Sequence, residues 1–283
     1  MRGETRRLFR DGRAAAGAGL LALAVLAALL APLLAGDPIA QRDIVATRFL
    51  PPLASDPLGS FHLLGTDRFG RDVWARLVFG ARVSLGVGTL AVLLSVSIGV
   101  AVGAVAGFRR GWLRVGLLGL TDFALALPRV VLLLLLASLW RPSAGLVILV
   151  LGLTGWMPIA RLVYAEVRAL SGRPFVESAV GLGVPGHRIL ARHIIPNALT
   201  PVIVAAALGL GNAILLEAGL SFLGLGVQPP TPSWGNLIAS GRDTLVNAPW
   251  VAAAPGVALV LVVVGATLLG DAVRDRLDPG EVR

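Results

Sequence analysis

Cysteine and lysine are both absent from this sequence, and histidine occurs three times. Without cysteine the chain forms no disulfide and offers no thiolate to a metal ion. Without lysine it cannot contain the G-x-x-x-x-G-K-[S/T] loop that cradles nucleotide phosphates, so we expect no ATPase site in this chain. The histidines are scattered, and His187 and His193 lack the helix-face spacing of metal ligands. We therefore expect no metal site and no catalytic residue.

Charged residues are also few. They make up 14% of the chain, whereas hydrophobic residues make up 56% and the mean hydropathy is +0.82. This is more apolar surface than one soluble core of this length needs, which indicates an integral membrane protein. A net charge of +9 would suggest a nucleic-acid partner in a soluble protein. Here the arginines cluster beside apolar runs, where they set membrane orientation, so we expect no nucleic acid.

Six apolar runs are long enough to cross a bilayer, which predicts an all-α membrane protein. The first run follows an arginine-rich tail, residues 1–13. We expect it to be retained, because Leu33-Leu34-Ala35 fits the cleavage site of a signal peptide poorly. The predicted spans are residues 14–35, 83–107, 113–140, 144–163, 199–223 and 251–270.

The polar segments between the spans predict sidedness. Sixteen of the 25 arginines fall on the side that holds both termini and the segment 164–197, which predicts that this side is cytoplasmic. Residues 36–82 are expected to form an ordered extracytoplasmic loop, with a short amphipathic helix along the membrane surface over residues 72–83. Residues 224–250 are expected to form a second outer loop, and residues 271–283 a cytoplasmic tail.

Small residues and proline mark two of the spans. Gly99, Gly103 and Gly107 recur at four-residue spacing, which either lets another helix approach closely or reflects only a glycine-rich composition. Pro128 lies inside the third span and predicts a kink or a break there.

The polar segment 164–197 predicts two short helices joined by a sharp turn. One helical pattern begins at Pro174 and ends near Gly183, which is expected to adopt a left-handed cap conformation. The other begins near Pro185 and is expected to end at Pro196. Neither reaches the roughly 12 to 15 residues that an isolated helix needs in water, so both must dock on a larger partner. The side expected to face that partner carries Val176, Ala179 and Val180.

The same segment resembles the EAA loop of binding-protein-dependent ABC transporter permeases, through Glu177-Ser178-Ala179, Gly183 and His193-Ile194-Ile195-Pro196. It departs from the family pattern at Ser178, His193 and Ile195, where alanine, isoleucine and leucine are usual. Further stretches resemble the dipeptide, oligopeptide and nickel branch of this family. They are His62-Leu63-Leu64-Gly65-Thr66-Asp67, Gly70-Arg71-Asp72, Leu220-Ser221-Phe222-Leu223-Gly224-Leu225-Gly226, Pro232-Ser233-Trp234-Gly235, Ala248-Pro249-Trp250, Gly270-Asp271 and Leu277-Asp278-Pro279.

The resemblance implies a permease subunit of a bacterial or archaeal cytoplasmic (inner) membrane importer for a peptide, nickel or similar small solute. It also implies a second permease chain that completes the pore as a heterodimer, two cytoplasmic ATPase subunits that use the ATP, and an extracytoplasmic binding protein. No cofactor would be bound by this chain. The residues implied to couple it to the ATPase are Glu177, Ser178, Ala179, Gly183, His193 and Pro196. A secondary transporter or channel that works alone is the alternative, and a membrane enzyme is a more distant one.

Two charged residues fall inside predicted spans at similar depths. Counted at 1.5 Å per residue, Arg129 lies roughly 24 Å and Glu217 roughly 27 Å from the cytoplasmic starts of their spans. An intramembrane charge is paired or faces water, so we expect either an ion pair between them or that both line the translocation path. The alternative is that each reaches the outer headgroups separately. Asp122, also inside a span, has no obvious partner.

Overall fold

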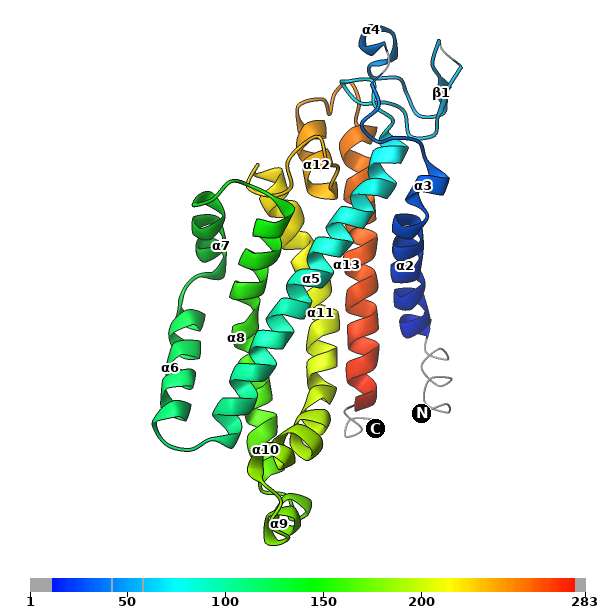
Figure 1. Ribbon diagram of the computed structural model, residues 1–283. Helices are drawn as coiled ribbons and strands as arrows, with labels where there is room; N and C mark the ends of the chain where they lie inside the picture. The colour runs from blue at the N-terminus through cyan, green and yellow to red at the C-terminus, as the bar shows by residue number, and fades with distance from the viewer. Residues whose placement is uncertain (1–11, 42, 58, 278–283) are drawn as a thin grey trace.

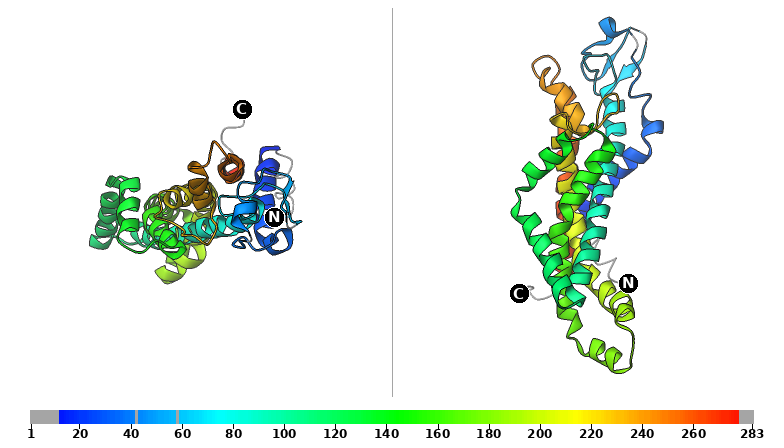
Figure 2. Two further views of the ribbon diagram at one scale, coloured as in Figure 1. Left: turned by 90° about the horizontal axis from the view of Figure 1, so that it is seen from above. Right: turned by 60° about the vertical axis from the view of Figure 1, so that its left-hand side comes forward.

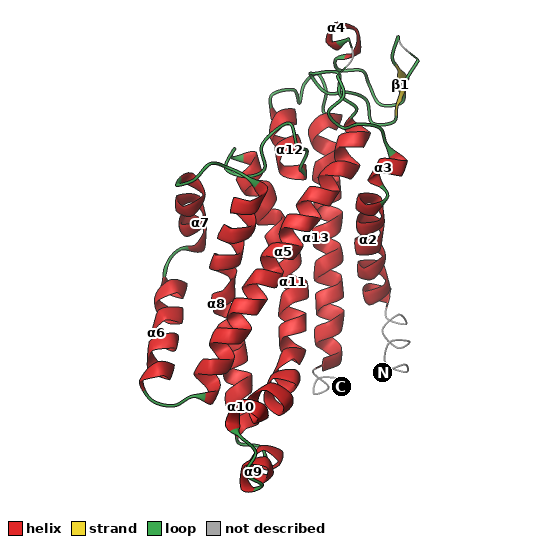
Figure 3. Cartoon of the chain, viewed as in Figure 1, coloured by secondary structure: helices red, strands yellow, loops and turns green. Residues whose placement is uncertain are grey.

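Long helices form most of this computed structural model, which describes residues 12–41, 43–57 and 59–277 (Figures 1 and 3). Five helices in these ranges are long and apolar enough to cross a membrane. They are α2 (Gly12–Leu29), α5 (Val73–Phe108), α8 (Ala144–Ser171), α11 (Ile195–Phe222) and α13 (Trp250–Leu277). A sixth crossing results if α6 (Trp112–Ala126) and α7 (Arg129–Ser138), which are bent by 88° at a break, count as one span. The predicted all-α membrane architecture is confirmed.

The shorter elements lie at the two ends of the bundle (Figure 1). One end, called the α12 end below, carries α3 (Ala31–Leu34), α4 (Ile44–Thr47), β1 (Ala54–Ser55), β2 (Phe61–His62) and α12 (Trp234–Arg242). The other, called the α9 end, carries α9 (Pro174–Gly181), α10 (Gly186–Ile189) and the π-helical turn η1 (Leu190–Ile194). Strands β1 and β2 pair antiparallel, with Ala54 opposite His62. Helix α2 begins and α13 ends toward the α9 end (Figure 1).

Glycines on α5 allow its close contact with α8. A Cβ added at Gly99 would lie 2.7 Å from Cβ of Ile159, and one added at Gly107 would lie 2.8 Å from Cβ of Val167. Gly103, between them, faces the backbone of Ala160 at similarly close range. Any larger side chain would push the helices apart, so the four-residue spacing is a packing ridge and not merely a consequence of composition.

Helix α5 is longer than predicted. Asp72 caps its amino terminus by accepting a hydrogen bond of 2.8 Å from the N–H of Ala75, and the helix then runs without a break to Phe108. The separate surface helix predicted for residues 72–83 is therefore wrong. The arginines of this segment contact the protein: Arg76 is buried, and Arg82 donates to the carbonyl of Ala28 at 3.0 Å.

The helices flanking the segment 164–197 also extend further than predicted. Helix α8 continues to Ser171 because neither glycine nor proline occurs between the predicted end of the span at residue 163 and Gly172. Pro196 does not end a helix; it lies in the first turn of α11. The π-helical turn η1 ends just before Pro196, so the proline, which has no backbone N–H, lies where the helix changes from π-helical to α-helical hydrogen bonds. As a result α10, η1 and α11 form one continuous helical segment.

Pro128 lies at the break between α6 and α7, as predicted. Leu127 before it is extended, the conformation that a following proline favours. Seen along the bundle axis, α6 and α7 form one edge of the molecule and α2 the opposite edge (Figure 2). The buried apolar clusters join α5 and α11 to α13 and α2 on one side and to α8 and α7 on the other.

Candidate functional site

Helix α9 and the turn after it project from the bundle, beyond the ends of the long helices (Figure 1). Gly183 has a φ of +76°, which confirms the predicted left-handed cap. The N–H of Val184 bonds to the carbonyl of Ala179 at 3.1 Å, and the N–H of Gly183 bonds to the carbonyl of Val180 at 2.9 Å. These are the two hydrogen bonds of a Schellman motif, so the turn holds a defined shape.

The inner side of α9 packs on its own chain. Val176 is buried with Val167 of α8 and Ile189 of α10, and Ala179 is partly buried beside them. The expectation that Val176 and Ala179 face a partner is therefore wrong, because the short helix first needs an apolar side to hold it on the bundle. Val180, in contrast, is 60% exposed.

The outer side of α9 is unexpectedly apolar. Phe175 is 43% exposed and Leu182 is 85% exposed. Leu182 directly follows α9 as its carboxyl-terminal cap, seven residues or about two helical turns after Phe175, so both lie on the same side of the helix. Glu177, Ser178 and Gly183 are exposed next to them, as are His193 and Pro196 on the following helical segment. The predicted coupling residues are thus accessible, with Ala179 only partly so.

Glu217 is buried on α11 beneath the α12 end and is held by serines. Its carboxylate accepts hydrogen bonds from Ser84 of α5 at 2.8 Å and from Ser221 at 2.7 Å. Ser84 also accepts from the backbone N–H of Trp234, the first residue of α12, at 3.1 Å. This network joins three helices, and Ser84 and Trp234 had not been connected with Glu217 from the sequence.

The predicted ion pair between Arg129 and Glu217 does not form. Neither residue takes part in an ion pair within the described ranges. The reason is direction: Glu217 faces α5 and α12, whereas Arg129, at the start of α7, extends toward α8.

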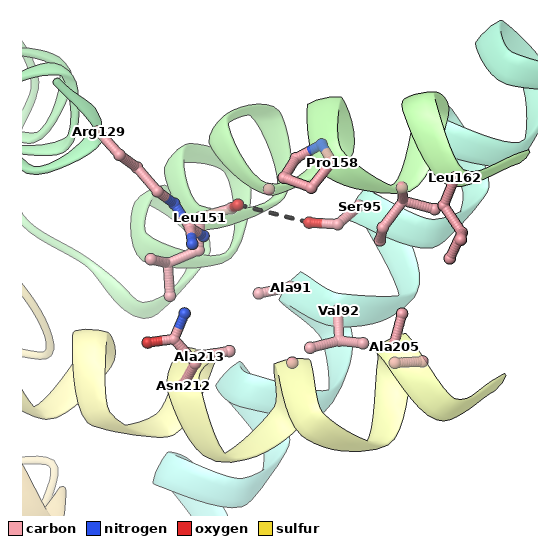
Figure 4. Close-up of a pocket in the computed structure, with 14 residues that line it drawn as sticks. Ala91, Val92, Ser95, Arg129, Leu151, Pro158, Leu162, Ala205, Asn212 and Ala213 are labelled. Carbon is pink, nitrogen blue, oxygen red and sulfur yellow. Dashed lines mark hydrogen bonds between the residues drawn. The ribbon is translucent and has the colours of Figure 1, made fainter. Parts of the chain in front are cut away.

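Arg129 lines a cavity of about 430 Å³ between α5, α8 and α11 (Figure 4). Its polar lining side chains are Arg129, Ser95 and Asn212, and the rest of the wall is formed by apolar residues and glycine. A Cβ added at Gly155 of α8 would overlap the hydroxyl oxygen of Ser95, so this glycine makes room for Ser95, and a terminal nitrogen of Arg129 lies at contact distance, 3.4 Å from the same point. Ser95 donates to the carbonyl of Gly152 at 3.1 Å. Asn212 could have been identified from the sequence as a candidate lining residue, because it is a polar residue within an apolar run.

Asp122 does have a partner. It forms an ion pair with Arg161 of α8, which connects α6 to the rest of the bundle. The pair had been missed because Asp122 and Arg161 lie 39 residues apart on different helices.

The loop between α3 and α5 is also held by charged groups. His62 bonds to Asp72 at 2.7 Å, and Arg71 bonds to Asp67 at 2.7 Å. Trp250 of α13 donates to the carbonyl of Thr66 at 3.2 Å, which attaches this loop to the bundle. Within the described ranges, no three histidine or carboxylate side chains form a group suited to a metal ion.

Comparison with known proteins agrees with these features. Residues 99–283 match the family described as "Binding-protein-dependent transport system inner membrane component". Residues 4–52 match the family described as "N-terminal TM domain of oligopeptide transport permease C".

Individual relatives cover most of the chain. A dipeptide transport system permease protein of Alkalihalophilus pseudofirmus is 36% identical over 274 residues, which are 97% of this chain and 88% of the relative. A putative peptide transport system permease protein of Brucella abortus is 39% identical over 276 residues, or 97% and 90% of the two chains. A putative peptide permease protein of Brucella suis is 42% identical over 220 residues, or 77% and 73%. The chain therefore belongs to the family of binding-protein-dependent transport system inner membrane components, and it is a multi-pass permease of the ABC transporter class.

Proposed function

We propose that this chain is a permease subunit of an ABC importer for peptides. It forms half of the membrane pore, and a second permease chain forms the other half. The names of the relatives favour peptides over nickel, because each of the three describes a peptide or dipeptide permease. ATP is bound and hydrolysed by separate subunits, since a chain without lysine has no residue for the phosphate loop.

The observation that carries the coupling role is the exposed apolar side of α9. Phe175 and Leu182 are exposed although the helix lies beyond the end of the membrane bundle, where lipid tails do not cover it. An amphipathic helix of this kind fits a hydrophobic groove on a partner protein. The inner side of α9 is already packed on α8. Movement of a partner bound to the outer side of α9 would therefore be transmitted to the bundle through the contact of Val176 with Val167.

The orientation follows from the same assignment. If the ATPase binds at the α9 end, this end faces the cytoplasm, where the arginine excess of the short segments also places it. The α12 end, with α4, β1, β2 and α12, then faces the extracytoplasmic binding protein.

Copurification tests this function directly. The chain is expressed with its second permease chain and ATPase subunits, and the ATPase retained on the tagged permease is measured. The double substitution Phe175→Ser with Leu182→Ser should release most of it. Val246→Ser, which removes a 95% exposed apolar side chain from the segment between α12 and α13, is the control and should retain the ATPase.

Uptake into vesicles then separates the importer from a transporter that works alone. Peptide uptake should require ATP inside the compartment that holds the ATPase subunits and should stop when they are removed. Uptake driven by an ion gradient without ATPase subunits would show a secondary transporter instead, and would overturn the proposal.

A further inference from the structure

Arg129 is a half-buried charged group about half way along the length of the bundle, and its hydrogen bonding is incomplete. Its Nε is buried and has no hydrogen-bond partner, and its guanidinium forms no ion pair with a carboxylate in the described part of the chain. Gly155, which it lies against, is near the middle of α8. A charge at this depth is costly unless it has a partner or faces water, so Arg129 faces the cavity for a reason other than packing.

The cavity has the electrostatic character of an anion site. The guanidinium extends into the space between α8 and α11, on the side where the amide of Asn212 lies (Figure 4). No acidic side chain belongs to the wall that the structure describes. Arg129 is also the first residue of the ten-residue helix α7, so the positive end of that helix dipole adds to its charge.

The volume of the cavity and its hydrogen-bond donors limit the kind of ligand that it can bind. A volume of about 430 Å³ falls within the range of sites for small molecules. Arginine presents planar paired donors that match a carboxylate, and the asparagine amide adds a neutral donor and acceptor. Most of the remaining wall is apolar, from side chains such as Ala91, Val92 and Leu151, which suits an uncharged side chain next to the carboxylate.

We infer that this cavity is a subsite for the carboxyl-terminal carboxylate of a peptide on its way through the pore, and that Arg129 binds that carboxylate. The identity of the ligand rests on the proposed function. The requirement for an anion rests on the cavity itself. Every unmodified peptide carries this carboxylate whatever its side chains, so a single arginine can serve a mixed set of peptides.

The first experiment measures binding without the binding protein. The purified complex of permease and ATPase subunits is heated with dialanine or with dialaninamide at equal ionic strength, and the unfolding temperature is recorded. At a concentration about tenfold above its dissociation constant, dialanine should raise this temperature by roughly 2 °C. Dialaninamide should not. Equal shifts would show that the carboxylate is not recognised, and no shift with either compound would show that the cavity does not bind the peptide, so either result would overturn the inference.

Variants locate the effect in the cavity. Arg129→Gln should abolish the dialanine shift, and Arg129→Lys should leave part of it. Arg141→Gln, which removes an exposed arginine after α7, should leave it intact. Gly209→Leu should also abolish it, because a side chain added at Gly209 meets no protein atom within 4 Å of its Cβ and so enters the cavity. The wild-type comparison and Gly209→Leu decide the matter even if Arg129→Gln does not assemble.

Uptake separates this inference from the proposed function. Vesicles are given alanine peptides of two to five residues, and the lumen is analysed by mass spectrometry. Arg129→Gln should lower ATP-dependent uptake at least tenfold, with Arg129→Lys intermediate. If wild-type vesicles accumulate no peptide, the proposed function fails. If wild type and Arg129→Gln accumulate peptide equally, the function stands and the subsite is overturned.

Discussion

Ser84 and Glu217 are 133 residues apart in the sequence and share a hydrogen bond of 2.8 Å in the interior of the bundle. The same serine hydroxyl accepts the backbone N–H of Trp234, so one small side chain joins α5, α11 and the start of α12. Glu217 is fully buried, and it therefore depends on Ser84 and Ser221 for its hydrogen bonds. This explains why an acidic residue is tolerated in an otherwise apolar helix.

Removing the carboxyl group should destabilise this network. Glu217→Ala leaves two buried hydroxyls without their acceptor and should lower the free energy of unfolding by about 1–3 kcal/mol. Glu217→Gln keeps the shape and one acceptor oxygen and should cost less. Thermal unfolding of the purified complex measures both. Asp243→Asn, which breaks only an exposed ion pair with Arg242, is the control and should change little. Equal stability of all three variants would contradict the role of Glu217.

The contact between α5 and α8 should be sensitive to a single methyl group. Gly103→Ala places a Cβ against the backbone of Ala160, and the strain should cost about 1–3 kcal/mol. Gly86→Ala, on the same helix, meets no atom within 4 Å and should be neutral or slightly stabilising. The amount of folded protein in the membrane and its unfolding temperature report the difference. Similar behaviour of the two variants would show that the helices are not in close contact there.

The turn at Gly183 should matter for coupling more than for folding. Gly183→Val forces a β-branched residue into a left-handed conformation, at a cost of about 1–2 kcal/mol. The surroundings are open, so the turn should change shape while the protein remains inserted. ATP hydrolysis should then proceed without peptide uptake, and both are measured in the same vesicles. Gly181→Val, two residues earlier inside α9 and also in open space, should stay coupled. Normal uptake by Gly183→Val would remove the turn from the mechanism.

Reversing one charge of the ion pair between Asp122 and Arg161 should be destabilising, and reversing both charges should restore stability. Asp122→Arg or Arg161→Asp alone places like charges together and should loosen α6 from α8. The double exchange restores a pair of opposite charges. A double-mutant cycle on unfolding should give a coupling free energy of about 1 kcal/mol, the scale found for polar contacts between membrane helices. Additive effects of the two substitutions would mean that the residues act independently.

The sequence by itself determined the membrane class, the places of the apolar spans, the break at Pro128 and the left-handed turn at Gly183. Each depends on a local property: hydropathy over about 20 residues, the missing N–H of proline, or the missing Cβ of glycine. The family resemblance rested on short motifs and was confirmed by the comparisons. Helix ends were less accurate, because packing extends a helix beyond the residues that favour it, as in the 36-residue α5.

Only the tertiary structure decided which charged and polar side chains meet. Depth along the spans suggested that Arg129 and Glu217 pair, but depth says nothing of the direction in which a side chain points. Rotation of each helix about its axis is set by packing, such as the contact of Gly88 of α5 with Ile214 of α11. Glu217, on the same helix as Ile214, is thereby turned toward Ser84, whereas Arg129 is left at the cavity.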